Sequence, residues 1–264
     1  MKIFLTGATG YIGKRLLIQL LEEGHRVVCS VRDKKRLSLK LYQNHLDKIE
    51  IIENDFLDKN TLANIPKDID FAYYLVHSMS SNDGDFLEKE RISAQNFRKA
   101  LENTSVKQVV FLTGIINEEK LSKHLQSRKN VEQALKSNHY ALTCLRAGII
   151  VGSGSASFEI IRDLVEKLPI MVAPKWLKTK CQPIAIRNVI QFLIKVLGVE
   201  KTYHQNYDIA SDDVLTYKEM LQQYAEVRRL KRWIYTVPVM TPKLSSYWLY
   251  FITSTSYSLA VNLV

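Results

Sequence analysis

The stretch that decides the fold is "TGATGYIG", residues 6–13, which follows the apolar run "KIFL" and leads into "KRLLIQLLEEG". It spaces Gly7, Gly10 and Gly13 as GxxGxxG where a strand pattern gives way to a helical one. In this setting the first glycine permits a tight turn, the second lets backbone N–H groups approach a pyrophosphate, and the third lets helix and strand pack closely. The helix N-terminus beyond them favours an anion. The stretch predicts a dinucleotide-binding loop; the alternative is a Gly-rich turn with no ligand.

The rest of the first half repeats the alternation of short apolar runs and helical patterns. Strands are predicted over residues 2–7, 26–31, 49–55, 70–77, 107–114 and 140–148, and helices over 11–24, 84–104 and 127–138. Strands that alternate with helices form βαβ units with right-handed connections and a mainly parallel sheet. The predicted fold class is therefore α/β, a Rossmann-type doubly wound parallel sheet.

The pattern changes after Gly148. A Gly/Ser loop, "VGSGSASF", precedes helices predicted at 159–168, 187–198 and 216–227 and strands at 169–174, 205–211 and 232–238. We expect an NAD(P)-binding domain over residues 1–150 and a smaller α/β substrate or ligand lobe over residues 151–264. Because the chain stops in mid-run at "SLAVNLV", we expect that lobe to be cut short of its natural C-terminus.

Charge and cysteine usage narrow the class of partner. Lys and Arg total 37 against 27 Asp and Glu, a formal net charge of +10 that favours anionic partners. The excess is spread along the chain without interleaved aromatics, so a phosphate-bearing cofactor is favoured and a nucleic acid is not. Cys29, Cys144 and Cys181 show no CxxC spacing, which indicates neither a disulfide framework nor a metal site.

The two ends of the chain bear on its compartment. The N-terminus reaches its glycines after six residues and has no apolar region of signal-peptide length, so we expect a reducing cytoplasm. Residues 244–264 contain no charge, Gly or Pro and are long enough to cross a bilayer. They are rich in Ser and Thr, and this favours a helix buried in protein over a membrane span.

The residues after the second predicted strand decide which cofactor is preferred. An acid there would hydrogen-bond the ribose 2′-hydroxyl of NAD. The chain instead reads "VCSVRDKKR", in which Ser30, Arg32 and the following lysines suit a 2′-phosphate. NADP(H) is therefore favoured over NAD(H), with Arg32 as the phosphate ligand. Asp33, beside Arg32, is the complication, because its carboxylate could reach a ribose hydroxyl.

Several strings together resemble a known family. "TGATGYIG", "SVRD", "NDFLD", "AYYLVHSM", "LSKHLQSR", "LRAGIIVGSGSASFE" and "LSSYW" are similar to atypical or extended short-chain dehydrogenase/reductases, in particular a bacterial NAD(P)H-binding, nucleoside-diphosphate-sugar epimerase-like subgroup. The resemblance covers essentially the whole chain. Proteins of this type usually continue into a further C-terminal domain.

The resemblance implies cofactor contacts by position. The pyrophosphate would lie on Gly7, Thr9, Gly10, Tyr11, Ile12 and Gly13, and the 2′-phosphate on Arg32. Asp55 and Phe56 would flank the adenine, and Leu75, Val76 and His77 the ribose and nicotinamide. Thr113 and Gly114 would lie under the nicotinamide. The alternatives are that Phe56 and Leu75 belong to the core and that His77 caps the helix after it.

The same resemblance makes the catalytic position unusual. Active members of the family use a Tyr as acid/base and a Lys four residues later, with a Ser on the preceding strand. Here those positions read His124, Arg128 and Thr113. Arg128 could clamp the ribose or a phosphate, and its charge would lower the pKa of a neighbouring His. Three interpretations stay open: a ligand clamp, altered acid/base catalysis through His124, and a solvated helix face.

The Gly/Ser loop supplies the candidate substrate contacts, Ser153, Ser155, Ser157 and Phe158. Their hydroxyls and N–H groups suit an anion, or they form an N-cap for the next helix. Two classes of function follow. The first is an NADP(H)-dependent oxidoreductase or epimerase-like enzyme with a non-standard catalytic site. The second is a non-catalytic dinucleotide binder, either a redox sensor or an assembly factor.

Overall fold

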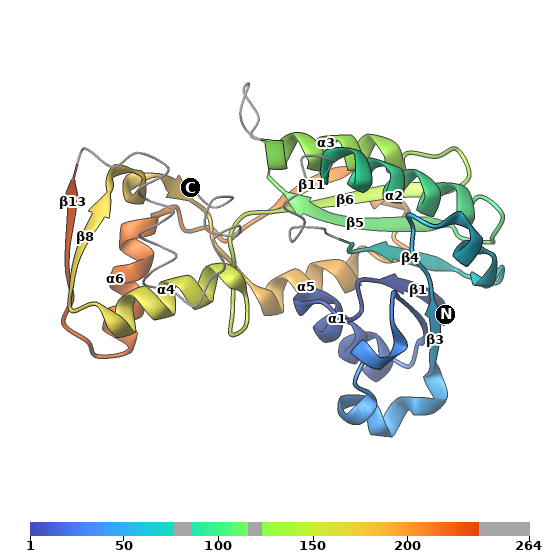
Figure 1. Cartoon of the computed structure of the whole chain (residues 1–264), viewed down its shortest axis with the longest axis horizontal. Coiled ribbons are helices and arrows are strands. Elements are labelled where there is room, and N and C mark those ends of the chain that lie inside the picture. Colours follow the sequence, from blue (N-terminus) through green and yellow to red (C-terminus); the bar gives the residue numbers. More distant parts are fainter. Residues whose placement is uncertain (77–85, 116–122, 238–264) are drawn as a thin grey trace. The chain divides into compact units, whose positions relative to one another are not determined.

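The computed structural model describes residues 1–76, 86–115 and 123–237, with the backbone alone at 123–125. It divides into two compact units (Figure 1). The first unit contains Met1–Ala147 and Arg187–Ile209, and the second contains Gly148–Ile186 and the chain from Ala210 onward. The expected boundary at residue 150 lies next to this junction. Residues 187–209, expected in the lobe, lie in the first unit instead.

The first unit is built on a seven-stranded parallel sheet of order β11-β6-β5-β4-β1-β2-β3. This is the doubly wound Rossmann order, and the predicted fold class is confirmed. The strand order reverses between β1 and β4, where ligands bind in such sheets. The strands are β1 (Lys2–Thr6), β2 (Arg26–Val31), β3 (Ile49–Glu53), β4 (Phe71–Tyr74), β5 (Gln108–Gly114), β6 (Ala141–Ala147) and β11 (Asn206–Ile209).

Helices cover both faces of this sheet, α2 and α3 on one side and α1 and α5 on the other (Figure 1). Side chains alternate along each strand: Tyr74 points toward α2, where its ring meets Phe97 at 4.8 Å between centroids. The preceding residue, Tyr73, points the other way and donates a hydrogen bond of 2.9 Å to the carbonyl of Leu193 on α5. The helices are α1 (Tyr11–Glu22), α2 (Phe86–Leu101), α3 (Lys123–Leu135) and α5 (Ile186–Lys195).

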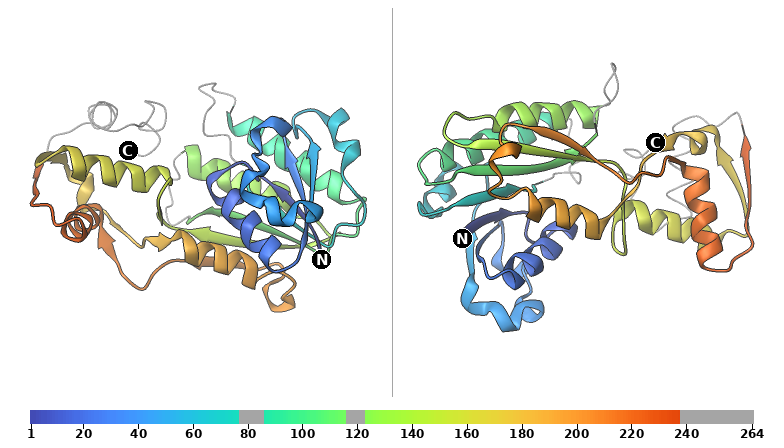
Figure 2. Two further views of the ribbon diagram at one scale, coloured as in Figure 1. Left: turned by 90° about the horizontal axis from the view of Figure 1, so that it is seen from below. Right: turned by 180° about the vertical axis from the view of Figure 1, so that it is seen from behind.

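A buried glutamine fastens the returning segment 187–209 to the sheet (Figure 2, orange). Gln108, at the start of β5, is fully buried. Its Nε2 donates to Thr143 Oγ1 at 2.7 Å and to the carbonyl of Val196 at 3.1 Å, and its Oε1 accepts the Gly198 N–H at 2.8 Å. The predicted strand at 205–211 then becomes β11, which pairs with β6 rather than with the lobe.

The second unit packs two helices against small sheets around its own apolar core. Its helices are α4 (Ala156–Lys167) and α6 (Tyr217–Val227). Its strands are β7 (Ile150–Val151), β8 (Ile170–Pro174), β9 (Lys180–Cys181), β10 (Ile184–Ala185), β12 (Leu215–Thr216) and β13 (Trp233–Val237). Short 3₁₀ turns complete the two units: η1 (Lys34–Arg36), η2 (Leu39–Lys48), η3 (Lys59–Asn64), η4 (Lys175–Lys178) and η5 (Glu200–Thr202).

Candidate cofactor site

The glycine loop lies at the switch point of the sheet, between the carboxyl ends of β1 and β4. Gly7 has a φ of +68°, and a Cβ there would lie 2.6 Å from the carbonyl oxygen of Leu75. A Cβ on Gly13 would lie 2.1 Å from the Gly7 oxygen. The chain's own packing therefore requires glycine at both positions. Gly10 differs: its φ of −78° suits any residue, and its Cβ would meet only the Gly7 oxygen, at 3.2 Å.

The helix that follows this loop begins without a side-chain cap. Gly10 is its N-cap, so the cap offers no side-chain acceptor, and the first turn contains no acid. The first N–H groups of a helix have no partner within the helix and carry its positive pole. Gly10, the residue at this pole, is exposed. An exposed glycine before an uncapped helix fits a pyrophosphate.

The region expected to meet the adenosine end carries a cluster of exposed basic side chains. Arg32, Lys34, Lys35 and Arg36 are all exposed, and Arg32 makes no ion pair with any described residue. Asp33 instead shapes the turn: its carboxylate accepts the Lys35 N–H at 2.9 Å and caps η1. One of its oxygens is therefore already used by the chain.

The neighbouring "NDF" segment is held by hydrogen bonds after β3. Asn54 is buried, and its amide donates to the carbonyl of Thr61 at 2.6 Å. Asp55 is half-buried and accepts the Leu57 N–H at 2.9 Å. The ring of Phe56 is buried against Phe97, with centroids 5.5 Å apart. Asp55 thus stays near the surface, whereas the side chain of Phe56 belongs to the core.

The carboxyl end of β5 carries an unsatisfied hydroxyl. Thr113 is 6 % exposed, and its Oγ1 has no hydrogen-bond partner among the described residues. It lies two residues beyond Phe111, which pairs with Tyr74 on β4, so Thr113 faces the α2/α3 side of the sheet. Leu75 and Val76, half-buried, continue β4 beside it, and Gly114 ends β5. A buried orphan hydroxyl at a sheet's carboxyl edge is a place for a ligand.

A second orphan polar atom comes from α3. Arg128 is half-buried, and its Nε is buried with no hydrogen-bond partner among the described residues. Burial lowers the pKa of the Arg128 guanidinium from its ordinary value, while the negative charge of Glu90 opposes that change. Arg128 is therefore not a fully solvated side chain, and the role of the His124/Arg128 pair stays a prediction.

Glu90, whose carboxylate lies beside Arg128, was not predicted from the sequence as a site residue. Glu90, on α2, is 4 % exposed and accepts a hydrogen bond from the fully buried hydroxyl of Ser127 on α3. Tyr74 lies next to this group and donates to Ser93 at 3.4 Å. A signal was available: Glu90 precedes Ala94 by four positions and Phe97 by seven, which places an acid on the apolar stripe of the helix.

Two predicted site residues cannot be placed. His77 lies outside the described residues. His124 lies within α3, in the part of that helix (residues 123–125) whose backbone alone is described.

The pyrophosphate residues Thr9, Tyr11 and Ile12 are all half-buried around the loop. The Tyr11 ring lies under the Arg15 guanidinium, 4.1 Å from its centroid.

The Gly/Ser loop of the second unit is closed largely by its own hydrogen bonds. Ser155, buried, donates to the carbonyl of Ile150 at 2.9 Å and accepts the Phe158 N–H at 3.2 Å as the N-cap of α4. Phe158 is half-buried, with its ring 5.6 Å from that of Tyr224. Ser153 is exposed and Ser157 is half-buried. The N-cap interpretation holds for Ser155, which leaves Ser153, Ser157 and Phe158 as candidate contacts.

The cysteines lie apart from these sites. Burial raises the pKa values of the Cys29 and Cys144 thiols to about 12, so neither is a thiolate at neutral pH. Cys181 is half-buried. No group of histidine, cysteine or acidic side chains in the described residues is arranged to hold a metal ion. No helix within those residues is long and apolar enough to cross a bilayer.

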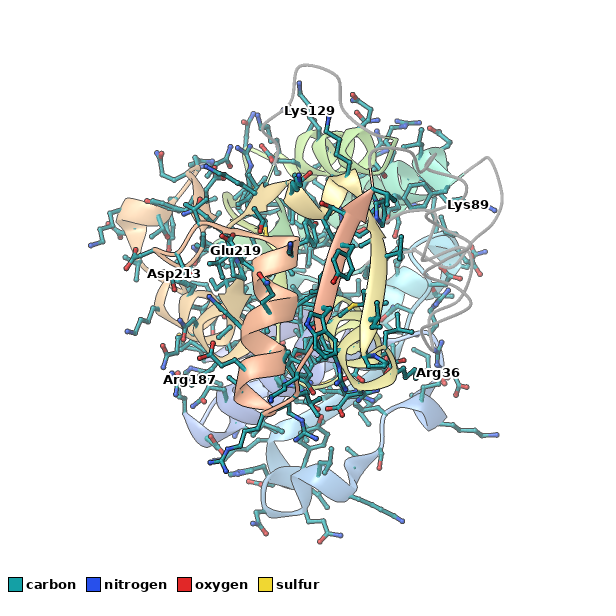
Figure 3. All side chains as sticks on the ribbon, turned by 90° about the vertical axis from the view of Figure 1, so that its left-hand side faces the viewer. Arg36, Lys89, Lys129, Arg187, Asp213 and Glu219 are labelled. Carbon is teal, nitrogen blue, oxygen red and sulfur yellow. The ribbon has the colours of Figure 1, made fainter. Side chains whose placement is uncertain are left out.

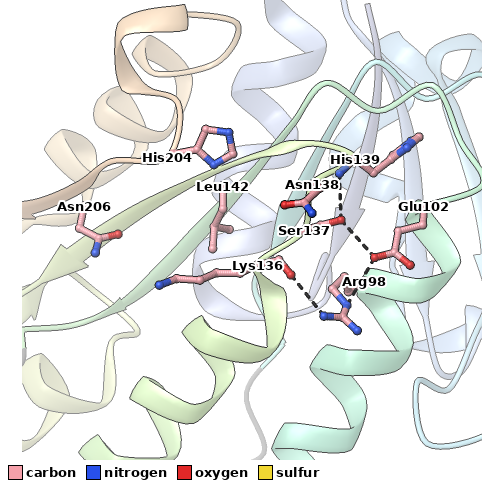
Figure 4. Close-up of a pocket in the computed structure, with 9 residues that line it drawn as sticks. All are labelled: Arg98, Glu102, Lys136, Ser137, Asn138, His139, Leu142, His204 and Asn206. Carbon is pink, nitrogen blue, oxygen red and sulfur yellow. Dashed lines mark hydrogen bonds and ion pairs between the residues drawn. The ribbon is translucent and has the colours of Figure 1, made fainter.

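A separate hollow of about 680 Å³ lies at the amino edge of the same sheet, away from the glycine loop (Figure 4). Two of its side chains hydrogen-bond to carbonyls at the helix ends beside them. Arg98 donates to the carbonyl of Lys136 at 3.3 Å, and the His139 ring lies 2.7 Å from the carbonyl of Thr104. Because α2 and α3 both end here, their negative poles disfavour an anion. The lining residues are Arg98, Glu102, Lys136, Ser137, Asn138, His139, Leu142, His204 and Asn206.

Solved structures share this fold at low sequence identity. UDP-N-acetylglucosamine 4-epimerase from Bacillus cereus is similar at a TM-score of 0.70 and 18% identity, over 100% of this chain and 97% of that one. UDP-glucuronic acid 4-epimerase from Bacillus cereus, in complex with UDP-glucuronic acid and NAD, is similar at 0.67 and 15%, over 99% and 97%. The epimerase Mth375 from Methanothermobacter thermautotrophicus is similar at 0.73 and 12%, over 99% and 90%.

Sequence comparison identifies the family. No curated protein sequence matches the chain significantly. A family model described as NAD(P)H-binding matches residues 7–156, a segment that begins in the glycine loop and ends in the Gly/Ser loop. The epimerase-like structural neighbours agree with the short-chain dehydrogenase/reductase resemblance of the sequence. The chain therefore belongs to the family described as NAD(P)H-binding.

Proposed function

We propose that this chain binds NADP(H) at the carboxyl edge of its parallel sheet and acts there as an oxidoreductase or epimerase-like enzyme with a non-standard catalytic site. The observation that carries the proposal is the pair of buried polar atoms, Thr113 Oγ1 and Arg128 Nε, that have no partner among the described residues. Orphan donors of this kind are costly unless a ligand completes them. They occur in the unit that also holds the uncapped glycine loop.

Each part of the site has its own task. The N–H groups at the start of α1 bind the pyrophosphate, and Arg128 donates to ribose hydroxyls through its planar guanidinium. The Thr113 hydroxyl orients the reacting carbonyl or the nicotinamide amide. The bound cofactor supplies hydride transfer, while protein groups provide binding, orientation and the proton. His124, four residues before Arg128 in the sequence, is the proposed acid/base.

The preference for NADP(H) rests on Arg32. Its guanidinium is exposed and free of ion pairs with the described residues, and Asp33 already uses a carboxylate oxygen on the turn. One solved neighbour was crystallised with NAD, so the proposed preference of this chain for NADP(H) needs its own test. Arg32→Ala should weaken NADPH binding by about 1.5–3 kcal/mol, the contribution of a charged hydrogen bond, and leave NADH binding unchanged. Fluorescence titration measures both, with Lys35→Ala as the matched control.

The proposed substrate is a nucleoside-diphosphate sugar or a related anionic carbonyl compound. Named structural neighbours act on UDP-sugars. In this chain Ser153, Ser157 and Phe158 are the proposed contacts, and Ser155 holds the loop in shape. Asp55 is proposed to meet the adenine end, together with Leu75, Val76 and Gly114 along the nicotinamide half.

A non-catalytic dinucleotide binder is the second candidate, and the buried cluster on α3 favours it. The Ser127 hydroxyl already donates a hydrogen bond to Glu90, and an arginine does not release a proton at ordinary pH. Among residues 124–128, which span the positions of the family's Tyr and Lys, His124 is therefore the one side chain that could exchange a proton with a substrate. A sensor or assembly factor would bind the dinucleotide without catalysing a reaction.

One titration series separates these candidates. NADPH and NADH are titrated into the chain by fluorescence, and the complex is then mixed with carbonyls, quinones and UDP-sugars. Failure to bind either dinucleotide would reject both candidates. Oxidation of bound NADPH that disappears in His124→Ala supports the enzyme, whereas oxidation that persists removes His124 as the acid/base. Tight binding with no turnover across the panel supports the sensor.

A further inference from the structure

The second unit exposes an apolar face on its two-stranded sheet, β8 and β13. The strands pair in parallel, with Trp233 opposite Ile170 and Tyr235 opposite Val172. These four side chains share the outer face and are 54%, 58%, 60% and 51% exposed. The alternate residues, Met171, Ala173 and Ile234, are buried in the core behind the strands. Figure 3 shows both strands in the foreground, with no described helix in front of them.

This face differs from the scattered apolar residues that every protein surface contains. Single exposed leucines or valines need no explanation, but a contiguous set does. Here two cross-strand pairs lie directly next to each other, and each contains an aromatic ring and a β-branched side chain. An exposed apolar patch of this kind marks an association site. The strand pair therefore presents a binding surface.

Positive charge brackets the surface at both ends of the strands. Arg229 and Lys231 are exposed just before β13, and Lys175 and Lys178 are exposed just after β8. None of the four forms an ion pair within the described part of the chain. The exposed acid nearest the start of β8 in the sequence, Glu166, accepts a hydrogen bond from Arg228 at 2.8 Å. The partner that complements this arrangement is apolar at its centre and anionic around it.

We propose that the β8/β13 face binds the surface of an anionic lipid bilayer. Tryptophan and tyrosine have an apolar body and a polar tip, which suits the boundary between lipid headgroups and acyl chains. Lysine and arginine beside them meet the negative lipid phosphates. An acidic protein would match the cations equally well. The flat pairs of aromatic and aliphatic side chains, with cations at both ends, favour the bilayer. This proposal does not depend on cofactor binding in the first unit.

The test uses the full chain and vesicles of defined composition. Co-sedimentation is measured with phosphatidylcholine vesicles and with vesicles containing phosphatidylglycerol. We expect the chain to bind the anionic vesicles. The bound fraction should fall steeply as the salt concentration rises from about 0.05 to about 0.5 M, because salt screens the attraction between surface charges. Trp233 should show a blue-shifted emission on binding, and that shift should be absent in Trp233→Phe.

Variants assign the binding to this face. Trp233→Ser combined with Tyr235→Ser should reduce vesicle binding by about tenfold or more, because both rings leave the interface. Lys231→Gln and Lys175→Gln should each reduce it by about fivefold. Val214→Ser removes an equally exposed apolar side chain elsewhere in the second unit and is the matched control. Circular dichroism and thermal melting report whether each variant is folded.

Three results would overturn the proposal. The first is the absence of vesicle binding by the folded wild-type chain. The second is binding that the face variants leave unchanged, which would assign membrane contact to the uncharged segment 244–264. The third is a dimer, seen by light scattering, that the Trp233→Ser/Tyr235→Ser variant separates while vesicle binding persists. That result would make the face an interface between copies of this chain.

Discussion

At the scale of single residues, the three glycines of the loop have separable roles. Gly7 and Gly13 are needed by the fold, because a Cβ would meet backbone atoms at 2.6 and 2.1 Å. Gly10 has an ordinary backbone conformation and a nearly open Cβ position. The fold alone therefore does not explain its glycine, whereas the proposed pyrophosphate contact would.

This difference gives the first prediction. Gly10→Ala should abolish NADPH binding in a fluorescence titration, yet lower the free energy of unfolding by less than about 1 kcal/mol. Gly13→Ala should destabilise the first unit by about 3 kcal/mol or more, because no flexible side chain can give way. Urea unfolding measures both. If Gly10→Ala kept full affinity, the pyrophosphate could not lie against this loop.

Glu90 gives the second residue-scale prediction. Its carboxylate accepts the Ser127 hydroxyl and opposes the desolvation of Arg128. Glu90→Ala should lower the free energy of unfolding by about 2–3 kcal/mol, since a hydrogen bond to a buried charge is lost. The double variant with Arg128→Met should recover part of that loss, which a double-mutant cycle measures.

The control for Glu90 lies on the same helix. Glu88 pairs with Arg91 at the surface, so Glu88→Ala should leave the free energy of unfolding nearly unchanged. Equal effects at positions 88 and 90 would show that the buried cluster contributes nothing to stability.

The same cluster shows what sequence alone could predict about the site. The glycine spacing was readable from the local pattern, and the family resemblance pointed to Thr113 and Arg128. Contacts between distant segments were not: Phe56 packs on Phe97, and Ser127 meets Glu90 across two helices. These contacts depend on tertiary packing, which no local period encodes.

At the scale of elements, α6 shows how a helix start responds to pH. Thr216 accepts the Glu219 N–H at 3.1 Å, and the Thr216 N–H donates to the Glu219 carboxylate at 2.6 Å. This capping box satisfies two donors that would otherwise lack partners. The hydrogen bond from the Thr216 backbone lowers the pKa of Glu219 from the ordinary value of 4.5.

The sign of the pH effect follows from linkage. A lowered pKa in the folded state means that the stabilisation is fully present above pH 4.5 and is lost as the pH falls through the folded pKa. The melting temperature of wild type should therefore exceed that of Glu219→Gln at pH 7, and the two melting temperatures should converge as the pH falls to about 3. Glu226→Gln, an exposed acid on the same helix, should show no such difference.

Most elements were predictable from periodicity, including every strand of the sheet between β1 and β6. The placement of the strand at 205–211 was not. Its alternation indicated a strand, but only the contacts of Asn206–Ile209 with β6 assign it to the main sheet. Residues 187–209 cross back because α5 covers the face of the sheet that α1 leaves open, a consequence of topology rather than of local sequence.

At the scale of the whole molecule, Gln108 is the polar anchor that joins the returning segment 187–209 to the sheet. Its amide is fully buried and bonds to Thr143, Val196 and Gly198. Gln108→Ala removes these bonds and leaves the Gly198 N–H without its acceptor. We expect a loss of about 2–4 kcal/mol in the free energy of unfolding, since each buried group left unsatisfied costs about 1–3 kcal/mol.

The measurement should locate this loss as well as size it. Amide hydrogen exchange in Gln108→Ala should rise at α5 and β11 before it rises at β1 and β2, because the anchor acts on the returning segment. Gln126→Ala, which removes the exposed bond to Asn130 on α3, is the matched control and should leave exchange at α5 unchanged. Uniform acceleration across the sheet would contradict the anchor role, since it would mean that Gln108 supports the first unit as a whole and that 187–209 needs no separate attachment.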